Sequence, residues 1–158
     1  MDVLEIKKYP EKVLRKTCKP VNKMSEQVKS LFKQMFITMR HFRGIGLAAP
    51  QVGINKKLII ADIGEGTIAL ANPEIVESKG NDVLSEGCLS IPEIYVDVER
   101  CYEILLTGID EKEELIEIKA KGLLARVLQH EIDHLNGKLI IDYFPFWQKM
   151  KFKMKTLI

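Results

Sequence analysis

The chain has 158 residues, of which 46% are hydrophobic and 29% are charged. This length and balance are typical of one globular domain with its own core, so we expect residues 1–158 to form a single domain. A formal net charge of +2 is too small to indicate direct recognition of nucleic acid.

The sequence shows no pattern typical of a secreted or membrane-spanning protein. Residues 1–5 lack the basic and then apolar layout of a signal peptide, and no stretch approaches the ~18 apolar residues of a membrane span. The three cysteines cannot all pair within the chain, because their number is odd. We therefore expect a cytoplasmic protein without a membrane partner, and a bacterial one since no transit peptide is visible.

Residues 25–41 carry the clearest helical pattern. Ser25 is a suitable N-cap, and large apolar side chains recur at three- and four-residue spacing behind it. These side chains are Val28, Leu31, Phe32, Met35, Phe36 and Met39. The next segment, residues 44–53, is rich in glycine and alanine, which indicates a backbone that another group approaches closely.

Strand patterns dominate the middle of the chain, and a helix follows them. Short β-prone runs occupy residues 58–61, 67–71, 94–98, 102–107 and 115–119, and residues 109–112 resemble a hairpin turn. Helical spacing returns over residues 122–136, where Asn136 and Gly137 end it. Helix, strands and helix in this order predict an α+β fold rather than alternating α/β units.

The tail is ambiguous between strand and helix. Residues 149–155 alternate lysine with apolar residues, which is a period-two pattern. Pro145 nevertheless suits a helix start, and lysine and methionine are good helix formers, so we predict a helix.

The segment His130-Glu131-Ile132-Asp133-His134 places two imidazoles four residues apart. On a helix they share one face and can bind one metal ion. Glu131 follows the first histidine directly, so it lies near the metal without having to bind it, as a general base for a metal-bound water requires. The motif uses two of the three histidines in the chain, which argues against coincidence. It predicts a metal-dependent hydrolase.

A catalytic site of this type needs a third protein ligand. Downstream of His134 the chain has no His, Cys or Glu, and Asp142 is the one acidic residue there, so the sequence departs from the thermolysin-like and metzincin patterns. The upstream candidates are His41, Cys18, Cys88 and Cys101. Cys88 has the most unusual context, because a glycine that exposes the backbone precedes it and a glutamate lies close by.

Three segments, taken together, resemble the peptide deformylase family. They are Gly44-Ile45-Gly46-Leu47-Ala48-Ala49-Pro50-Gln51, Glu86-Gly87-Cys88-Leu89-Ser90 and Gln129-His130-Glu131-Ile132-Asp133-His134. With residues 10–15, the resemblance covers nearly the whole chain as far as Gly137. It implies one catalytic domain over residues 1–158. The implied fold has mostly antiparallel sheets packed around a central metal-binding helix, with an N-terminal and a C-terminal helix.

Members of this family remove the formyl group from the N-terminal formylmethionine of new polypeptides and release formate. The resemblance implies Cys88, His130 and His134 as ligands of one divalent metal ion, usually Fe(II) in the cell. Zinc, nickel or cobalt can occupy the same ligands. The metal lowers the pKa of its water, the resulting hydroxide attacks the formyl carbon, and Glu131 passes the proton to the leaving amine.

The same resemblance implies roles for groups around the metal. The Gln51 amide and the Leu89 backbone N–H resemble the family's donors to the developing oxyanion. The peptide would add as a strand along Gly46, where a side chain would block it. The residues expected to line the methionine pocket are Ile45, Leu89, Arg126, Val127 and His130. For Arg126, an alternative is that only its stem packs there while its charged end points to solvent.

Glu86 and Asp133 resemble groups that orient the metal ligands, although an ordinary surface ion pair has the same composition. The expected partners are N-formylmethionyl nascent peptides. The basic tail, with Lys149, Lys151, Lys153 and Lys155, is a candidate for contact with the ribosome, and the alternative is a solvated basic face.

Two other functions remain open from the sequence. A zinc endopeptidase would need a different third ligand and a cleft open at both ends. A non-enzymatic domain would use the metal for folding, or bind N-termini without reacting. Three ligands and the retained Glu131 argue for an open, catalytic site, because structural zinc sites are usually closed by four protein ligands.

Overall fold

The computed structural model describes residues 2–156. Its helices are α1 (Glu26–His41), α2 (Gly122–Leu135) and α3 (Phe146–Thr156), with the short 3₁₀ helices η1 (Lys12–Arg15), η2 (Ala49–Val52) and η3 (Ile140–Tyr143). Its strands are β1 (Gly46–Ala48), β2 (Leu58–Ala61), β3 (Ile68–Lys79), β4 (Asp82–Cys88), β5 (Ile91–Arg100), β6 (Glu103–Ile109) and β7 (Leu115–Lys121).

Helix α1 forms where the periodicity predicts it. The Ser25 hydroxyl accepts a hydrogen bond from the Val28 backbone N–H at 3.2 Å, which satisfies one of the donors left free at the helix start. Phe32, Met35 and Met39 are at most 1% exposed and pack against one face of the sheet. The apolar stripe therefore decides which face of α1 turns inward.

The larger sheet has five antiparallel strands in the order β1-β2-β3-β6-β7. Strand β2 is fully buried, because the sheet is covered on both faces there. Leu58 and Ile60 pack in the same cluster as α1, whereas Ile59 and Ala61 pack in the cluster that contains α2. Alternation along one strand thus separates the two halves of the core.

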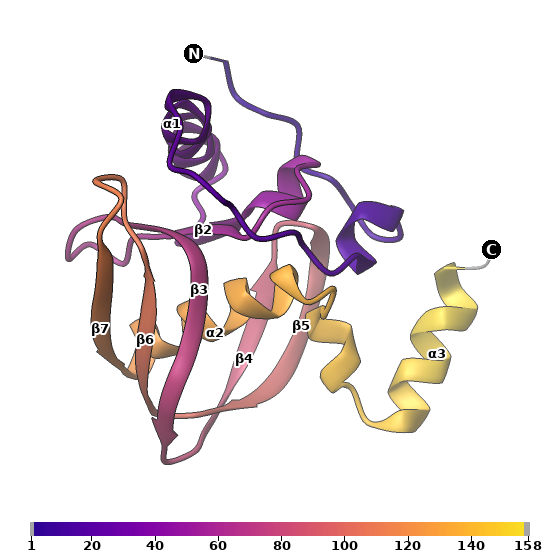
Figure 1. Ribbon diagram of the computed structural model, residues 1–158. Coiled ribbons are helices and arrows are strands. Elements are labelled where there is room, and N and C mark those ends of the chain that lie inside the picture. Colours follow the sequence, from indigo (N-terminus) through magenta and orange to yellow (C-terminus); the bar gives the residue numbers. More distant parts are fainter. Residues whose placement is uncertain (1, 157–158) are drawn as a thin grey trace.

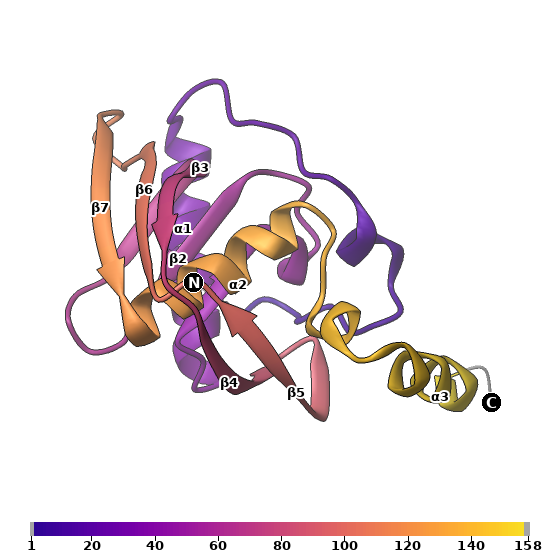
Figure 2. The same ribbon diagram turned by 90° about the horizontal axis from the view of Figure 1, so that it is seen from below.

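Helix α2 lies in the middle of the molecule, between the five-stranded sheet and the antiparallel pair β4–β5 (Figures 1 and 2). Ala125, Leu128 and Leu135 pack against the sheet. The prediction of an α+β fold with mostly antiparallel sheets is confirmed.

The sequence patterns missed some strands and shortened others. Strands β1 and β4 carry no clear β pattern, because glycine, serine and aspartate are disfavoured in strands. Strand β3 runs eight residues beyond the predicted 67–71, to Lys79, through a polar half that pairs with β6 across register shifts. The tail is helical, and α3 projects from the body (Figure 2). Within residues 2–156, no helix is long and apolar enough to cross a bilayer.

Gly137, just after α2, provides a test of this packing. Its φ is +71°, and a Cβ there would lie 2.5 Å from the Arg15 carbonyl oxygen. Gly64 also has a positive φ, but a Cβ there would meet nothing within 4 Å. We expect Gly64→Ala to cost about 1–2 kcal/mol of unfolding free energy through strain alone. Gly137→Ala should cost at least ~3 kcal/mol, because backbone must also move. Denaturant titration measures the free energy of unfolding of both variants. Equal losses would contradict the close approach of Gly137 to the Arg15 carbonyl.

Candidate metal centre

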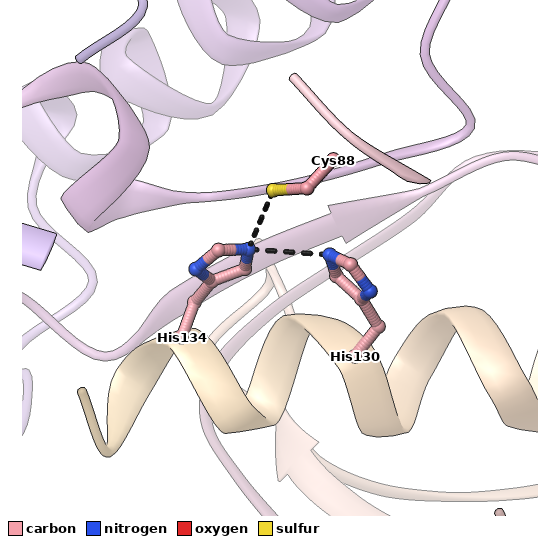
Figure 3. A group of neighbouring side chains, drawn as sticks. All are labelled: Cys88, His130 and His134. Atoms are coloured by element: carbon pink, nitrogen blue, oxygen red, sulfur yellow. Dashed lines mark hydrogen bonds between the residues drawn. The ribbon is translucent and has the colours of Figure 1, made fainter. Parts of the chain in front are cut away.

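Helix α2 presents both motif histidines to the end of strand β4. Packing of its apolar side against the sheet fixes the rotation of the helix. His130 and His134, one turn apart, then point together toward Cys88, the last residue of β4 (Figure 3). Spacing along the helix and the length of β4 therefore bring residues 46 positions apart to one place.

The donor atoms of these three side chains lie within 4.8 Å of one another. Cys88 Sγ is 3.4 Å from His134 Nε2, which is 3.2 Å from His130 Nε2 (Figure 3). One sulfur and two imidazole nitrogens are the donors that zinc and other late transition metals prefer. Among the described residues, Glu131 beside these donors has a buried Oε2 with no hydrogen-bond partner. The residues present fit an open, three-ligand metal site.

The charges around the histidines attract a cation. Burial lowers the pKa of His130, but interactions with Cys88 and Glu86 outweigh it and raise this pKa to about 10. Burial and the neighbouring His130 hold the pKa of His134 well below its usual range. A divalent ion on the two Nε2 atoms would meet the same anions in place of the proton.

Glu86 holds the outer nitrogen of His130. Its Oε1 lies 2.9 Å from His130 Nδ1, so an Nδ1–H donated to Glu86 leaves Nε2 as the metal-facing lone pair. Arg100 donates to Glu86 through Nε and Nη2, each at 2.9 Å, and Arg126 donates through Nη1 at 2.6 Å. Burial raises the pKa of Glu86, but the bonds from Arg100 and His130 prevail and lower it to about 2.

Asp133 lies one step further out than the sequence suggested. It accepts hydrogen bonds from Arg100 Nη1 and the Tyr143 hydroxyl, both at 2.6 Å. The chain of hydrogen bonds from Asp133 to His130 therefore runs through Arg100 and Glu86. Neither Arg100 nor Tyr143 was singled out from the sequence, because an arginine or tyrosine in a strand or loop looks like any surface residue.

Glu131 is 3% exposed and lies beside the ligands, with Oε1 3.9 Å from His130 Nε2. Burial, which outweighs the nearby positive charges of His130 and Arg100, raises its pKa to about 7. Gly46 of β1 packs directly on this carboxylate, since a Cβ there would lie 2.7 Å from Val127 Cγ1 and 3.0 Å from Glu131 Oε1. From the sequence, a glycine was expected here because it leaves room for an incoming peptide. The contacts observed around Gly46 are instead with side chains of α2.

Gln51, at the end of the glycine-rich segment, is 1% exposed and turned toward Cys88. Its Oε1 accepts the Ala48 N–H at 2.9 Å, which orients the amide. Its Nε2 lies 3.6 Å from Cys88 Sγ and 3.3 Å from Ser90 Oγ. Ser90 was part of the recognised segment, but it received no role from the sequence.

A cavity of about 590 Å³ opens beside these groups. The residues expected to line a substrate pocket, Ile45, Gly46, Leu89, Arg126, Val127 and His130, all line it. So do Lys8, Arg43, Glu93, Tyr95 and Leu123, which were not predicted. Within residues 2–156, β1 is an edge strand of its sheet, and Gly46 lies on that edge.

Two sequence alternatives are wrong. The charged end of Arg126 does not point to solvent: the residue is 5% exposed, and its guanidinium bonds to Glu86, the Val98 carbonyl and the Asp82 carbonyl. The other candidate third ligands lie elsewhere, with Cys18 in the core, where burial raises its pKa to about 11. His41 ends α1, and Cys101 packs beside that same core.

A model of the family described as Polypeptide deformylase matches residues 3–150. The chain belongs to the peptide deformylase family. A peptide deformylase of Hydrogenovibrio crunogenus is 51% identical over 146 residues, which cover 90% of this chain and 86% of the relative. One of Thermotoga maritima is 47% identical over 153 residues, covering 96% and 93%.

Solved structures of the deformylase family have the same fold. The crystal structure of a peptide deformylase from Legionella pneumophila aligns with a TM-score of 0.91 at 40% identity, covering 99% of this chain and 97% of that one. A structure from Synechococcus elongatus, in complex with actinonin, aligns with a TM-score of 0.90 at 39% identity, covering 97% and 85%. The resemblance drawn from three sequence segments is thus confirmed, and the chain is an enzyme of a metal-dependent family.

The metal centre makes a direct prediction about ligands. We expect Cys88→Ala to lose at least ~90% of bound zinc after dialysis, because two imidazoles alone are a weak site. Cys101→Ala is the matched control and should keep the wild-type metal content, since Cys101 lies outside the ligand group. Metal analysis of both variants tests this prediction, and circular dichroism verifies that both variants fold. Full metal retention in Cys88→Ala would rule out the thiolate as a ligand.

Proposed function

We propose that this enzyme removes the formyl group from the N-terminal formylmethionine of newly made polypeptides and releases formate. The observation that carries the proposal is the grouping of Cys88, His130 and His134 beside a buried Glu131, in a chain of the deformylase family. We propose one catalytic domain over residues 1–158, working in a bacterial cytoplasm, as the bacterial relatives suggest.

The sulfur of Cys88 and the Nε2 atoms of His130 and His134 would hold one divalent metal ion. We propose Fe(II) in the cell, and zinc, nickel or cobalt suit the same donors. When bound, the ion acts as a Lewis acid that lowers the pKa of water and polarises a carbonyl.

Glu131 is placed to move the proton. Burial raises the pKa of its carboxyl to about 7, so it can accept a proton and release it near neutral pH. It would take a proton from the attacking water on one carboxylate oxygen and give it to the amide nitrogen of the substrate. The bond between the formyl carbon and this nitrogen then breaks, leaving formate and a free amine.

Gln51 and Leu89 would stabilise the negative charge that develops on the formyl oxygen. The Gln51 Nε2 already faces the metal ligand Cys88, and the Ala48 N–H holds the other end of the amide. The Leu89 backbone N–H follows the ligand directly in the chain. A fixed donor costs no reorganisation during the reaction, which is why such groups accelerate it.

The substrate backbone would add to the edge of β1 at Gly46. Its methionine side chain would enter the cavity between Ile45, Leu89, Val127 and the stem of Arg126, which all line it. Ile45 is 44% exposed, so an apolar side chain that covers it gains by burial.

Formyl-Met-Ala tests the reaction. We expect the wild-type enzyme, purified without oxygen, to release formate from it and to leave internal peptide bonds intact. We expect Glu131→Ala to retain the metal and lose at least ~10³-fold in kcat/KM, because proton transfer fails. Glu65→Ala, at an exposed glutamate, should keep wild-type activity.

The outcomes separate the functions. Cleavage of an internal peptide bond without formate would establish an endopeptidase in place of a deformylase. Metal binding with no formate from the wild-type enzyme would indicate a binding domain.

We also propose that α3 contacts the ribosome. Phe146, Trp147, Met150 and Met154 are 47–77% exposed on this helix. On a 100° helical wheel they form one outward stripe, with two lysines along each side. Phe152 lies on the opposite side and stacks near Tyr9 and Phe144, which fixes the stripe outward. Lysines beside exposed aromatic rings suit a surface of phosphates and bases.

Charge reversal tests this contact without removing Phe152. Lys151→Glu with Lys155→Glu should lower co-sedimentation with ribosomes at least ~10-fold at low salt, because phosphate contacts become repulsive. The control, Lys23→Glu with Lys33→Glu, changes the net charge equally at exposed sites far along the chain. Unchanged co-sedimentation of the α3 variant, or after deletion of residues 147–158, would refute the proposal.

A further inference from the structure

Arg126 is buried, although it is an arginine on a helix that borders the cavity. It is 5% exposed. Its Nη1 donates to Glu86 Oε2 at 2.6 Å and to the Val98 carbonyl at 2.8 Å, while Nη2 donates to the Asp82 carbonyl at 2.6 Å. One guanidinium thus bonds to the start of β4, to Glu86 near its end, and to β5.

These bonds converge on the group that orients a metal ligand. Glu86 Oε1 is shared by His130 and Arg100, and Glu86 Oε2 is shared by Arg100 and Arg126. Arg126 precedes His130 by one helical turn. Helix α2 therefore supplies both the histidine and a guanidinium that bonds the histidine's carboxylate partner, Glu86. Arg100 holds the carboxylate from β5, and Arg126 holds it from α2.

The same guanidinium joins the two segments that carry the ligands. Strand β4 ends in Cys88, and α2 carries His130 and His134. The hydrogen bonds from Arg126 to Asp82, at the start of β4, and to Glu86, near its end, join this strand to α2. This side chain therefore connects the strand that ends in Cys88 to the helix that carries both imidazoles.

We infer that Arg126 is a positioning residue for the metal: its guanidinium sets Glu86, and through it His130, while its stem forms part of the cavity wall. The inference rests on the proposed function only for the meaning of that cavity. Loss of the guanidinium would leave Glu86 Oε2 bonded to Arg100 alone and two carbonyls without this donor. The His130 ring and the end of β4 would then fluctuate, and metal affinity would fall.

Arg126→Met is the main variant, because methionine keeps an apolar stem of similar reach and removes the charged end. Arg126→Lys keeps the charge, but its single ammonium nitrogen cannot take the places of both Nη1 and Nη2. Arg15→Met is the control: Arg15 likewise bonds a carboxylate and a backbone carbonyl, with two bonds to Asp142 and one to Gly137, but it does not bond Glu86. Each variant is measured as apo-protein, with zinc affinity from chelator competition and the absorption spectrum of the cobalt-loaded form.

We expect zinc affinity to fall about tenfold in Arg126→Met and by less in Arg126→Lys, as is typical when a partner of a metal ligand is lost. The cobalt bands should shift in Arg126→Met. Arg15→Met should bind zinc within about twofold of wild type, whatever its loss of thermal stability.

Wild-type zinc affinity and cobalt bands in Arg126→Met would overturn the inference, as would an equal loss of affinity in Arg15→Met. Should Arg126→Met fail to fold, wild-type affinity in Arg126→Lys would overturn it instead. None of these readouts needs substrate. Absence of formate release by the wild-type enzyme would therefore remove the proposed function and leave the metal result standing.

Discussion

The carboxylate of Glu86 lies buried between two guanidinium groups and an imidazole. An unpaired buried carboxylate is costly, so all of these partners must be in place together. Glu86 lies on β4, whereas its partners come from β5 and α2, so this one group joins three elements. Because β4 ends in Cys88 and α2 carries both histidines, the partners of this one charge also connect the elements that hold the three candidate metal ligands.

Helix α2 is buried on its polar side as well as its apolar side. Gln129 shows how this is possible: its amide donates to the Cys101 carbonyl and accepts the Cys101 N–H, so it completes the hydrogen bonds of a strand end. Glu131 differs, because its buried Oε2 has no partner in the described chain and the residue lies beside the side chains that could hold a metal ion. Unsatisfied polar atoms on an otherwise well-paired helix mark the place where an outside group belongs.

Local patterns in the sequence were sufficient for α1, for α2 and for the pair of histidines, since each depends on spacing within one helix. They also indicated Cys88 as a candidate metal ligand, but only because the sequence after His134 has no His, Cys or Glu to complete the site. The partners of Glu86 could not be predicted from the sequence. Arg100 and Arg126 lie 14 and 40 residues from it, and nothing in their own neighbourhoods distinguishes a buried arginine from an exposed one. Strand β4 was missed because its pairing with β5, rather than its composition, makes it a strand.

Strand β4 has little apolar burial to hold it. Val83 and Leu84 are 57% and 48% exposed, and its sheet has two strands. The hydrogen bonds of Asp82 and Glu86 with arginines must therefore contribute what packing provides elsewhere. Exposed polar bonds contribute little to stability, but the bonds to Glu86 are buried and join charged groups, so each contributes more and its loss costs more. The two parts of the fold are therefore held differently: apolar packing joins α1 to the five-stranded sheet, whereas the arginine–glutamate network joins β4, which ends in Cys88, to α2, which carries the histidines.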